Sequence, residues 1–139
     1  MIDELLERST TARALADRLE DSDVIVYVRF RILDTAVLTG RIGLLSTVQG
    51  IRFLVVELAS GRTRTDNLIT LGHELRHAAE IADAPAVVNS DTLSRHYASI
   101  GVRVSPSSYL EAYETQAAAE AATLIRRELG RRAVTTAQR

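Results

Sequence analysis

Two histidines four residues apart, His73 and His77, have the clearest chemical potential in this sequence. Residues four apart on an α-helix lie one turn apart on the same face, so both imidazoles can reach one metal ion. Glu74 follows the first histidine and projects beside the pair, where it can take a proton from a metal-bound water without occupying a coordination position. The segment 71–77 therefore predicts a zinc site with His73 and His77 as ligands and Glu74 as general base.

The residue types that are missing narrow the chemistry further. The sequence has no cysteine, which excludes disulfides, thiol catalysis and cysteine-bound structural zinc. All 17 residues counted as Lys or Arg are arginine, which excludes a lysine nucleophile or a Schiff base. The predicted Zn²⁺ must therefore be held by histidine and carboxylate ligands.

Length and composition favour one ordinary globular domain. The 139 residues are 46% hydrophobic and 25% charged, with a net charge of −1. This near neutrality indicates neither a nucleic-acid-binding nor a membrane-binding surface. The stretch 1–20 is charged and amphipathic, unlike a signal peptide, and no apolar run reaches membrane-spanning length. We expect a single cytoplasmic domain over residues 1–139, with its core at 24–129.

The hydrophobic pattern predicts an α+β fold around the motif. Leucines at helical spacing indicate an N-terminal helix that stops at residues 21–23. Three stretches rich in β-branched and aromatic residues predict strands, and their short connections predict an antiparallel meander. Asp66 is the expected N-cap of the motif helix, and Gly130 is the expected C-cap of a long C-terminal helix. The expected boundaries are 24–30, 36–45 and 51–58 for the strands, and about 66–82, 91–100 and 107 or 108 to 129 for the later helices.

The motif helix is predicted to have two different faces. At about 100° per residue, its apolar residues cluster on one side, and His73, His77 and Glu80 form a stripe on the other. The helix should pack the apolar side on the sheet and turn both imidazoles toward another element. The apolar side consists of Leu68, Leu71, Leu75, Ala78, Ala79 and Ala82.

Zinc needs a third protein ligand, and the long C-terminal helix offers one. By the same arithmetic, Glu114 lies at the centre of that helix's apolar stripe. An unpaired carboxylate there would cost several kcal/mol, so Glu114 needs a metal ion or a cation, such as an arginine, as its partner. Four other side chains remain candidates for the third ligand: Glu120, Glu111, His96 and Glu80.

Several neighbouring side chains have expected supporting roles. We expect Glu80 to face solvent, with a hydrogen bond to the outer nitrogen of a ligating histidine as the alternative. His96 lies in a short polar helix and is expected at the surface. Tyr109 and Tyr113 are near Glu114 in sequence and are expected to pack in the core, with donation to an oxyanion as the alternative.

The order of these features resembles the gluzincin branch of the zincin metallopeptidases. The shared features are a strand, a polar loop, a His-Glu-Leu-x-His helix, and a later segment Glu-Thr-Gln-Ala at 114–117, and they cover residues 50–129. The His-Glu-x-x-His motif is specific, whereas the Glu-x-x-Ala pattern is less so. The chain is also similar to small bacterial proteins that contain a His-Glu-Leu-x-His-Ala-x-Glu motif.

The resemblance implies a zincin-like fold and a zinc-dependent peptidase that acts on a peptide or protein substrate. It implies that His73, His77 and Glu114 bind zinc and that Glu74 is the general base. It further implies that the strand 51–58 is an edge strand along which an extended peptide lies.

One departure from the gluzincin pattern favours a second interpretation. Ala118 stands four positions after Glu114, where many gluzincins have an acidic or amide residue that supports a ligating histidine. The alternative is a non-catalytic zincin-like domain whose metal organises the fold or whose cleft binds a partner. The presence of Glu74 favours the peptidase, because a structural metal site needs no base. A di-iron protein with a Glu-x-x-His motif at 74–77 would need a second such motif and four long helices, neither of which the sequence provides.

Overall fold

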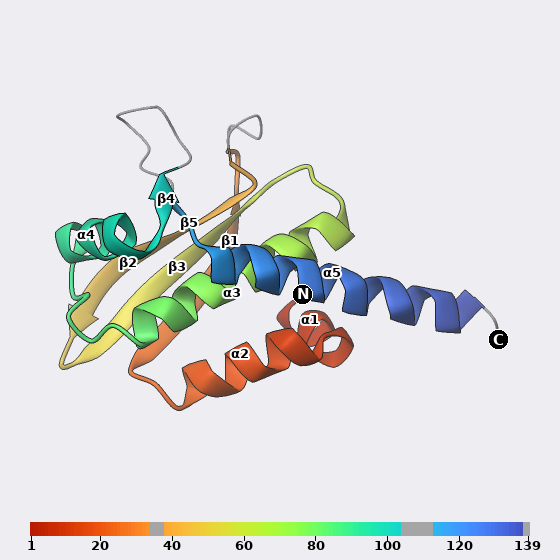
Figure 1. Ribbon diagram of the computed structural model, residues 1–139, viewed down its shortest axis with the longest axis horizontal. Coiled ribbons are helices and arrows are strands. Elements are labelled where there is room, and N and C mark those ends of the chain that lie inside the picture. Colours follow the sequence, from red (N-terminus) through yellow and green to blue (C-terminus); the bar gives the residue numbers. More distant parts are fainter. Residues whose placement is uncertain (34–37, 104–112, 138–139) are drawn as a thin grey trace.

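The computed structural model describes residues 1–33, 38–103 and 113–137 (Figure 1). Within these ranges the chain forms a mixed α+β fold with five helices, a three-stranded sheet and a short two-stranded sheet. None of the helices in these ranges combines the length and apolarity needed to cross a bilayer. The helices are α1 (Ile2–Arg8), α2 (Thr10–Glu20), α3 (Arg64–Ala82), α4 (Ser90–Ile100) and α5 (Gln116–Ala137). The strands are β1 (Val24–Arg31), β2 (Gly40–Val48), β3 (Ile51–Ala59), β4 (Val102–Arg103) and β5 (Tyr113–Glu114).

The predicted antiparallel meander is wrong, because β3 lies between β1 and β2. β3 runs parallel to β1 and antiparallel to β2, so the sheet is mixed and its order is β1-β3-β2. The connecting residues 32–39 are enough to span two strand spacings, roughly 10 Å, which leaves a place that β3 can fill. Residues 54–59 of β3 are all buried, as expected for a central strand with neighbours on both sides. The strand 51–58 is therefore not an edge strand.

The turn between β2 and β3 follows the expected hairpin chemistry. Gln49 and Gly50 have positive φ angles of 51° and 81°. Two consecutive residues with positive φ match the right-handed twist of a two-residue hairpin, and glycine adopts this conformation without steric cost. β2 begins at Gly40, four residues later than predicted, and pairs with β3 from there to the turn.

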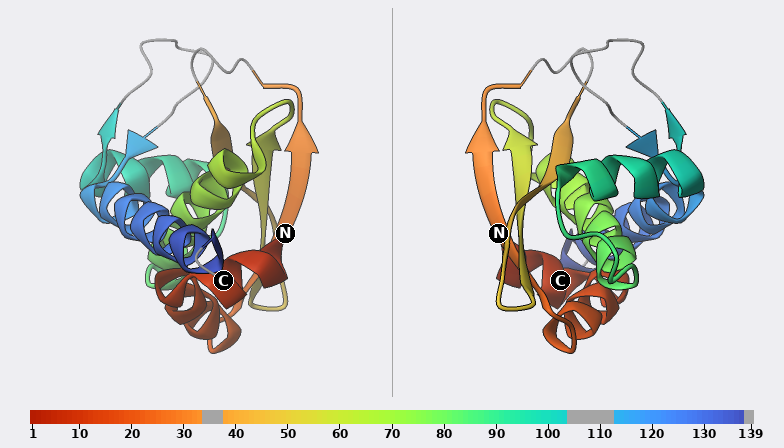
Figure 2. Two further views of the ribbon diagram at one scale, coloured as in Figure 1. Left: turned by 90° about the vertical axis from the view of Figure 1, so that its right-hand side faces the viewer. Right: turned by 90° about the vertical axis from the view of Figure 1, so that its left-hand side faces the viewer.

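α3 is the central helix of the molecule. One of its faces packs on the sheet, and α2 and α5 pack against its other sides (Figures 1 and 2). The predicted apolar face is confirmed, because Leu68, Leu71 and Leu75 are all buried in the core with side chains of β1 and β3. α5 approaches α3 closely at Gly72, where a Cβ atom would overlap the side chain of Ile125.

The two ends of α3 are fixed by side-chain hydrogen bonds. The N-cap is Thr63 rather than the predicted Asp66, since the Thr63 hydroxyl accepts from the Asp66 backbone N–H at 3.1 Å. At the other end, the buried Arg52 of β3 donates from Nη1 to the carbonyl of Ile81 at 2.7 Å and to the carbonyl of Ala84 at 2.8 Å. These bonds satisfy orphan carbonyls at the helix C-terminus and fix the motif helix on the sheet.

Two further predictions about helices are wrong. The N-terminal region forms two helices, because Ser9 adopts an extended conformation and its hydroxyl caps α2 by accepting from Ala12 N–H at 3.0 Å. The C-terminal helix α5 begins at Gln116 rather than at 107 or 108, and it continues past Gly130. A glycine at an exposed helix position costs only about 1 kcal/mol, so Gly130 does not end the helix.

Candidate metal centre

The two motif histidines meet on one side of α3. The Nε2 atoms of His73 and His77 lie 3.1 Å apart, and the two rings pack edge to face with centroids 4.8 Å apart. His77 is buried and His73 is half-buried. The one-turn spacing therefore brings both metal-binding nitrogens to the same point, as the sequence predicts.

Glu114 reaches the same point from a different element than predicted. It belongs to β5, and its backbone pairs with Val102 of β4, so the argument from a helical apolar stripe is wrong. Close packing at Gly101 helps to hold this strand, because a Cβ atom there would lie 3.1 Å from the Glu114 carbonyl oxygen. The Glu114 Oε1 atom lies 3.7 Å from Nε2 of His73. The three side chains place one donor atom each within 4.8 Å of one another.

These separations suit a small divalent cation. Zinc bonds to nitrogen and oxygen are about 2.0–2.1 Å long, so two ligands at a tetrahedral angle lie about 3.4 Å apart. The 3.1 Å between the histidines and the 3.7 Å from His73 to Glu114 lie on either side of that value. The three donor atoms lie within 4.8 Å of one another, so this cluster brings together histidine and carboxylate donors of the kind that zinc binds.

The outer nitrogen of His77 is held by a hydrogen-bond relay. Nδ1 of His77 donates to Oε2 of Glu80 at 2.9 Å, and the hydroxyl of Thr115 donates to Oε1 of the same carboxylate at 2.7 Å. Thr115 in turn accepts from Ala118 N–H at 3.2 Å, at the start of α5. With the proton on Nδ1, the lone pair of Nε2 points toward the shared point, which is the tautomer a metal requires.

The expected exposure of Glu80 is therefore wrong, and its alternative role is the one observed. Glu80 is buried together with His77, and residues from outside α3 cover both side chains: Thr115 donates to the Glu80 carboxylate, and Tyr97 packs on the His77 ring. Burial raises the pKa of Glu80, but hydrogen bonds with His77 and Thr115 outweigh this effect and keep the pKa low. Ala118 has no polar side-chain atom that could support a histidine ligand. The charged Glu80 gives His77 this support instead.

Two tyrosines complete the wall beside His77. Tyr97 of α4 packs its ring against His77 at 5.3 Å and donates its hydroxyl proton to the His77 carbonyl at 3.1 Å. Tyr113 of β5 stacks on Tyr97 with centroids 6.3 Å apart. These contacts agree with the expected core packing of Tyr113, whereas Tyr109 lies outside the described residues.

Glu74 is buried beside the cluster and lies under the start of β2. A Cβ atom added at Gly40 would lie 3.1 Å from the Oε1 atom of Glu74. The added Cβ atom would also overlap the methyl group of Thr70, so only glycine fits at this position. Burial raises the pKa of Glu74 to about 7; the charge of His77 lowers it, and that of Glu114 raises it. Among the described acidic groups around the cluster, Glu74 is the one whose pKa moves into the neutral range.

The two histidines have different electrostatic environments. Burial lowers the pKa of His73, and the neighbouring His77 lowers it further. Burial also lowers the pKa of His77, but the hydrogen bond that His77 donates to Glu80 and the charge of Glu74 outweigh it and raise the pKa. The carboxylates around His77 therefore increase its basicity, which strengthens a nitrogen ligand.

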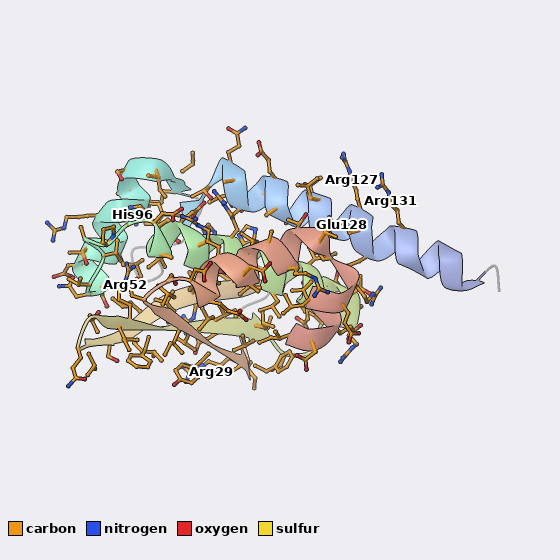
Figure 3. All side chains as sticks on the ribbon, turned by 90° about the horizontal axis from the view of Figure 1, so that it is seen from below. Arg29, Arg52, His96, Arg127, Glu128 and Arg131 are labelled. Atoms are coloured by element: carbon orange, nitrogen blue, oxygen red, sulfur yellow. The ribbon has the colours of Figure 1, made fainter. Side chains whose placement is uncertain are left out.

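The other candidates for the third ligand lie elsewhere or outside the described residues. Glu120 is exposed on α5 and accepts from the Gln116 side chain at 2.7 Å. His96 is half-buried on α4 (Figure 3), where it packs against Tyr97. It is not part of the cluster. Glu111 is not among the described residues. Within the described chain, the donor atoms that converge are those of His73, His77 and Glu114.

Two residues of this centre were not predicted from the sequence. Thr115 precedes a run of helix-forming residues, which is a signal for an N-cap, but the predicted helix began too early for this signal to be used. Gly40 gives no signal, because its close approach to Glu74 depends on the position of β2 in the sheet.

Comparisons of the chain with protein-family models, curated proteins and solved structures found no match.

Proposed function

We propose that this chain is a zinc-dependent peptidase with a zincin-like fold, in which His73, His77 and Glu114 hold the metal. The observation that supports this proposal most strongly is the position of Glu74, a buried carboxyl group next to a three-ligand cluster. Three protein ligands leave a fourth position of a tetrahedral metal open to water or substrate, which is typical of catalytic rather than structural zinc.

The proposed chemistry divides between the metal and the protein. Zinc at this cluster supplies Lewis-acid chemistry, since it makes water more acidic and polarises a carbonyl oxygen. Glu74 accepts the proton of the attacking water and delivers it to the leaving amine, for which a pKa of about 7 is well suited near neutral pH. Glu80 and Thr115 keep the ring of His77 in one tautomer and orientation throughout.

The peptide substrate is proposed to lie along β2. β2 is an edge strand of the sheet, and its first residue, Gly40, borders the Glu74 carboxyl group. An extended peptide that pairs with an exposed strand edge gains backbone hydrogen bonds without regard to its side chains. The scissile bond can then lie over Glu74, a role that the central strand β3 cannot fill.

A second candidate is a domain in which the metal only organises the fold. The observation that favours it is the relay from His77 through Glu80 to Thr115, which already joins α3 to the start of α5. A metal bound by α3 and β5 would strengthen the same connection. This function has no need of a buried carboxyl group beside the ligands.

Turnover by wild type and Glu74→Gln separates the two functions. The zinc-loaded proteins are incubated with a mixture of synthetic peptides that covers all residue types at each position, and cleavage products are followed by mass spectrometry. We expect Glu74→Gln to bind zinc as wild type does and to cleave roughly 10²–10⁴-fold more slowly. Glu120→Gln is the matched control and should cleave at the wild-type rate.

Cleavage by Glu74→Gln at the wild-type rate would refute the proposed mechanism. Full zinc occupancy without cleavage by any of the proteins would favour the structural metal site. Zinc content is measured in every sample, so that a loss of metal is not mistaken for a loss of the base.

A further inference from the structure

The three-stranded sheet has one face that no helix of the described chain covers. α1, α2 and α3 all lie on the other face, and the side chains of the outer face project from the lower side of the sheet in Figure 3, where no other element lies. Residues two apart on a strand share a face, so the outer face is read directly from the register of the strands. Six residues of this uncovered face are called the outer patch: Ile25, Tyr27, Phe53, Arg29, Arg31 and Arg41.

The first half of the outer patch is apolar. Tyr27 is 53% exposed and Ile25 is 42% exposed, although both lie in regular strand structure. The ring of Tyr27 stacks on that of Phe53, with centroids 6.4 Å apart and 17° between the planes. Ordered aromatic and aliphatic side chains in contact with water are typical of binding surfaces, because covering them releases water at little cost in side-chain entropy.

The second half of the outer patch is cationic. Arg29, Arg31 and Arg41 all donate hydrogen bonds to one buried carboxylate, that of Glu57. The Arg29 and Arg31 side chains remain 53% and 52% exposed, so their guanidinium groups still have donors facing solvent. Glu57 fixes the arginines in place, which reduces the entropy that a second carboxylate would have to overcome in order to bind them.

We propose that the outer patch binds an acidic segment of a partner protein that carries apolar residues beside its carboxylates. Arginine forks bind carboxylates with two parallel hydrogen bonds, and the neighbouring apolar half matches aliphatic or aromatic side chains of the same segment. The chain as a whole has a net charge of −1, so the cationic character is local to this surface. Tyr27 and Phe53 already stack on each other, and Ile25 extends this apolar half along β1, so its shape and character match apolar side chains of a polypeptide.

This interaction is distinct from the proposed peptidase activity. The outer patch and the metal centre lie on opposite sides of the sheet, since Arg41 of the patch and Gly40 beside Glu74 are consecutive residues of β2 and therefore face opposite ways. A bound partner would therefore leave Glu74 and the metal ligands uncovered. Binding is expected with and without zinc, so its outcome does not depend on whether the chain is a peptidase.

A displayed library of random 12-residue peptides, selected on the full-length chain, tests the proposal. We expect the selected peptides to be enriched in Asp and Glu next to aliphatic or aromatic residues. Individual peptides should bind the double variant Tyr27→Thr/Arg31→Gln at least about tenfold more weakly than wild type, since one aromatic and one arginine contact are removed. Arg29 and Arg41 stay in place in this variant, so that Glu57 keeps two of its partners.

The matched control is Leu124→Ala/Arg126→Gln, which removes one exposed apolar side chain and one exposed arginine from α5. It should bind the peptides as wild type does. Circular dichroism and thermal unfolding verify that the variants are folded, and Arg31→Gln alone replaces the double variant if that one unfolds.

Several outcomes would overturn the proposal. They are a selection without enriched peptides, enriched peptides without excess acidic residues, equal loss of binding in both double variants, and a homodimer in sedimentation that only Tyr27→Thr/Arg31→Gln dissociates. Tighter binding of single-stranded RNA than of any selected peptide, lost in the same variant, would likewise assign the surface to nucleic acid.

Discussion

Two regions of the molecule each bury a glutamate, Glu74 beside the candidate metal centre and Glu57 on the outer face of the sheet. Burial raises the pKa of Glu74 to about 7, and none of the ion pairs of the described residues includes this group. Burial also raises the pKa of Glu57, but hydrogen bonds from three arginines outweigh it and bring the pKa to about 2. The two results differ because Glu74 lies deep in the protein, whereas Glu57 lies near the surface beneath three arginines within hydrogen-bond reach.

The difference separates a carboxyl group suited to chemistry from one suited to structure. Glu57 stays charged at any physiological pH and holds three strands together through their arginines. Glu74 can be charged or neutral near pH 7, so it can take up a proton and return it. Glu80 combines properties of both, because it is charged and hydrogen-bonded like Glu57, but its partner His77 is a candidate metal ligand.

The largest expected effect on metal binding or stability concerns Glu80. Glu80→Gln should lower zinc affinity by roughly 10–100-fold, because His77 loses the charged acceptor that fixes its tautomer. Competition with a chelating dye measures the affinity, and Glu120→Gln serves as the control, since Glu120 is exposed and bonded only to Gln116 among the partners described for it. Equal affinities for the two variants would mean that Glu80 belongs to the structural class of Glu57.

A smaller effect is expected on folding stability. Glu57→Gln should reduce the free energy of unfolding by about 1–2 kcal/mol, since three half-exposed arginines lose their shared carboxylate. Glu74→Gln should reduce it by less than about 0.5 kcal/mol, or increase it, because a buried carboxyl group without a cation is itself unfavourable. Urea unfolding of both variants measures the difference, and the reverse ranking would contradict the assigned roles.

The smallest expected effect is the pH dependence of the difference in unfolding free energy between wild type and Glu57→Gln. The pKa of Glu57 is about 2 in the folded chain against an ordinary value of 4.5, so the unfolded chain binds the proton first as pH falls. The stability that Glu57 contributes is fully present above about pH 4.5 and is lost as pH falls toward 2. The gap in unfolding free energy between wild type and Glu57→Gln should therefore narrow from pH 5 to pH 3. A gap that widens on acidification would show that the arginines do not hold Glu57 in its charged form.

Local features were predictable from the sequence because they depend on the periodicity of a single element. The buried leucines of α3, the meeting of His73 with His77, and the position of β3 all follow from spacing along one helix or strand. The end of α4 at Ile100 was likewise predicted. No information from distant parts of the chain was needed for these.

Features that depend on contacts between elements were not predictable in the same way. The sheet order follows from β3 passing between two strands, which leaves no signal in the sequence of β3 itself. Glu114 joins the cluster, but through β5 rather than through a helix, so its prediction rested on a wrong reason. Glu80 was expected in solvent because helical phase alone does not reveal that Thr115 and Tyr97 cover that side of α3.

Anomalous diffraction from crystals grown with zinc tests the central claim most directly. We predict one ion bound by Nε2 of His73, Nε2 of His77 and a carboxylate oxygen of Glu114, at distances of about 2.0–2.2 Å, with its fourth position open toward Glu74. An ion at another position, an ion coordinated by Glu80 in place of Glu114, or no ion at these three residues at saturating zinc would contradict the account.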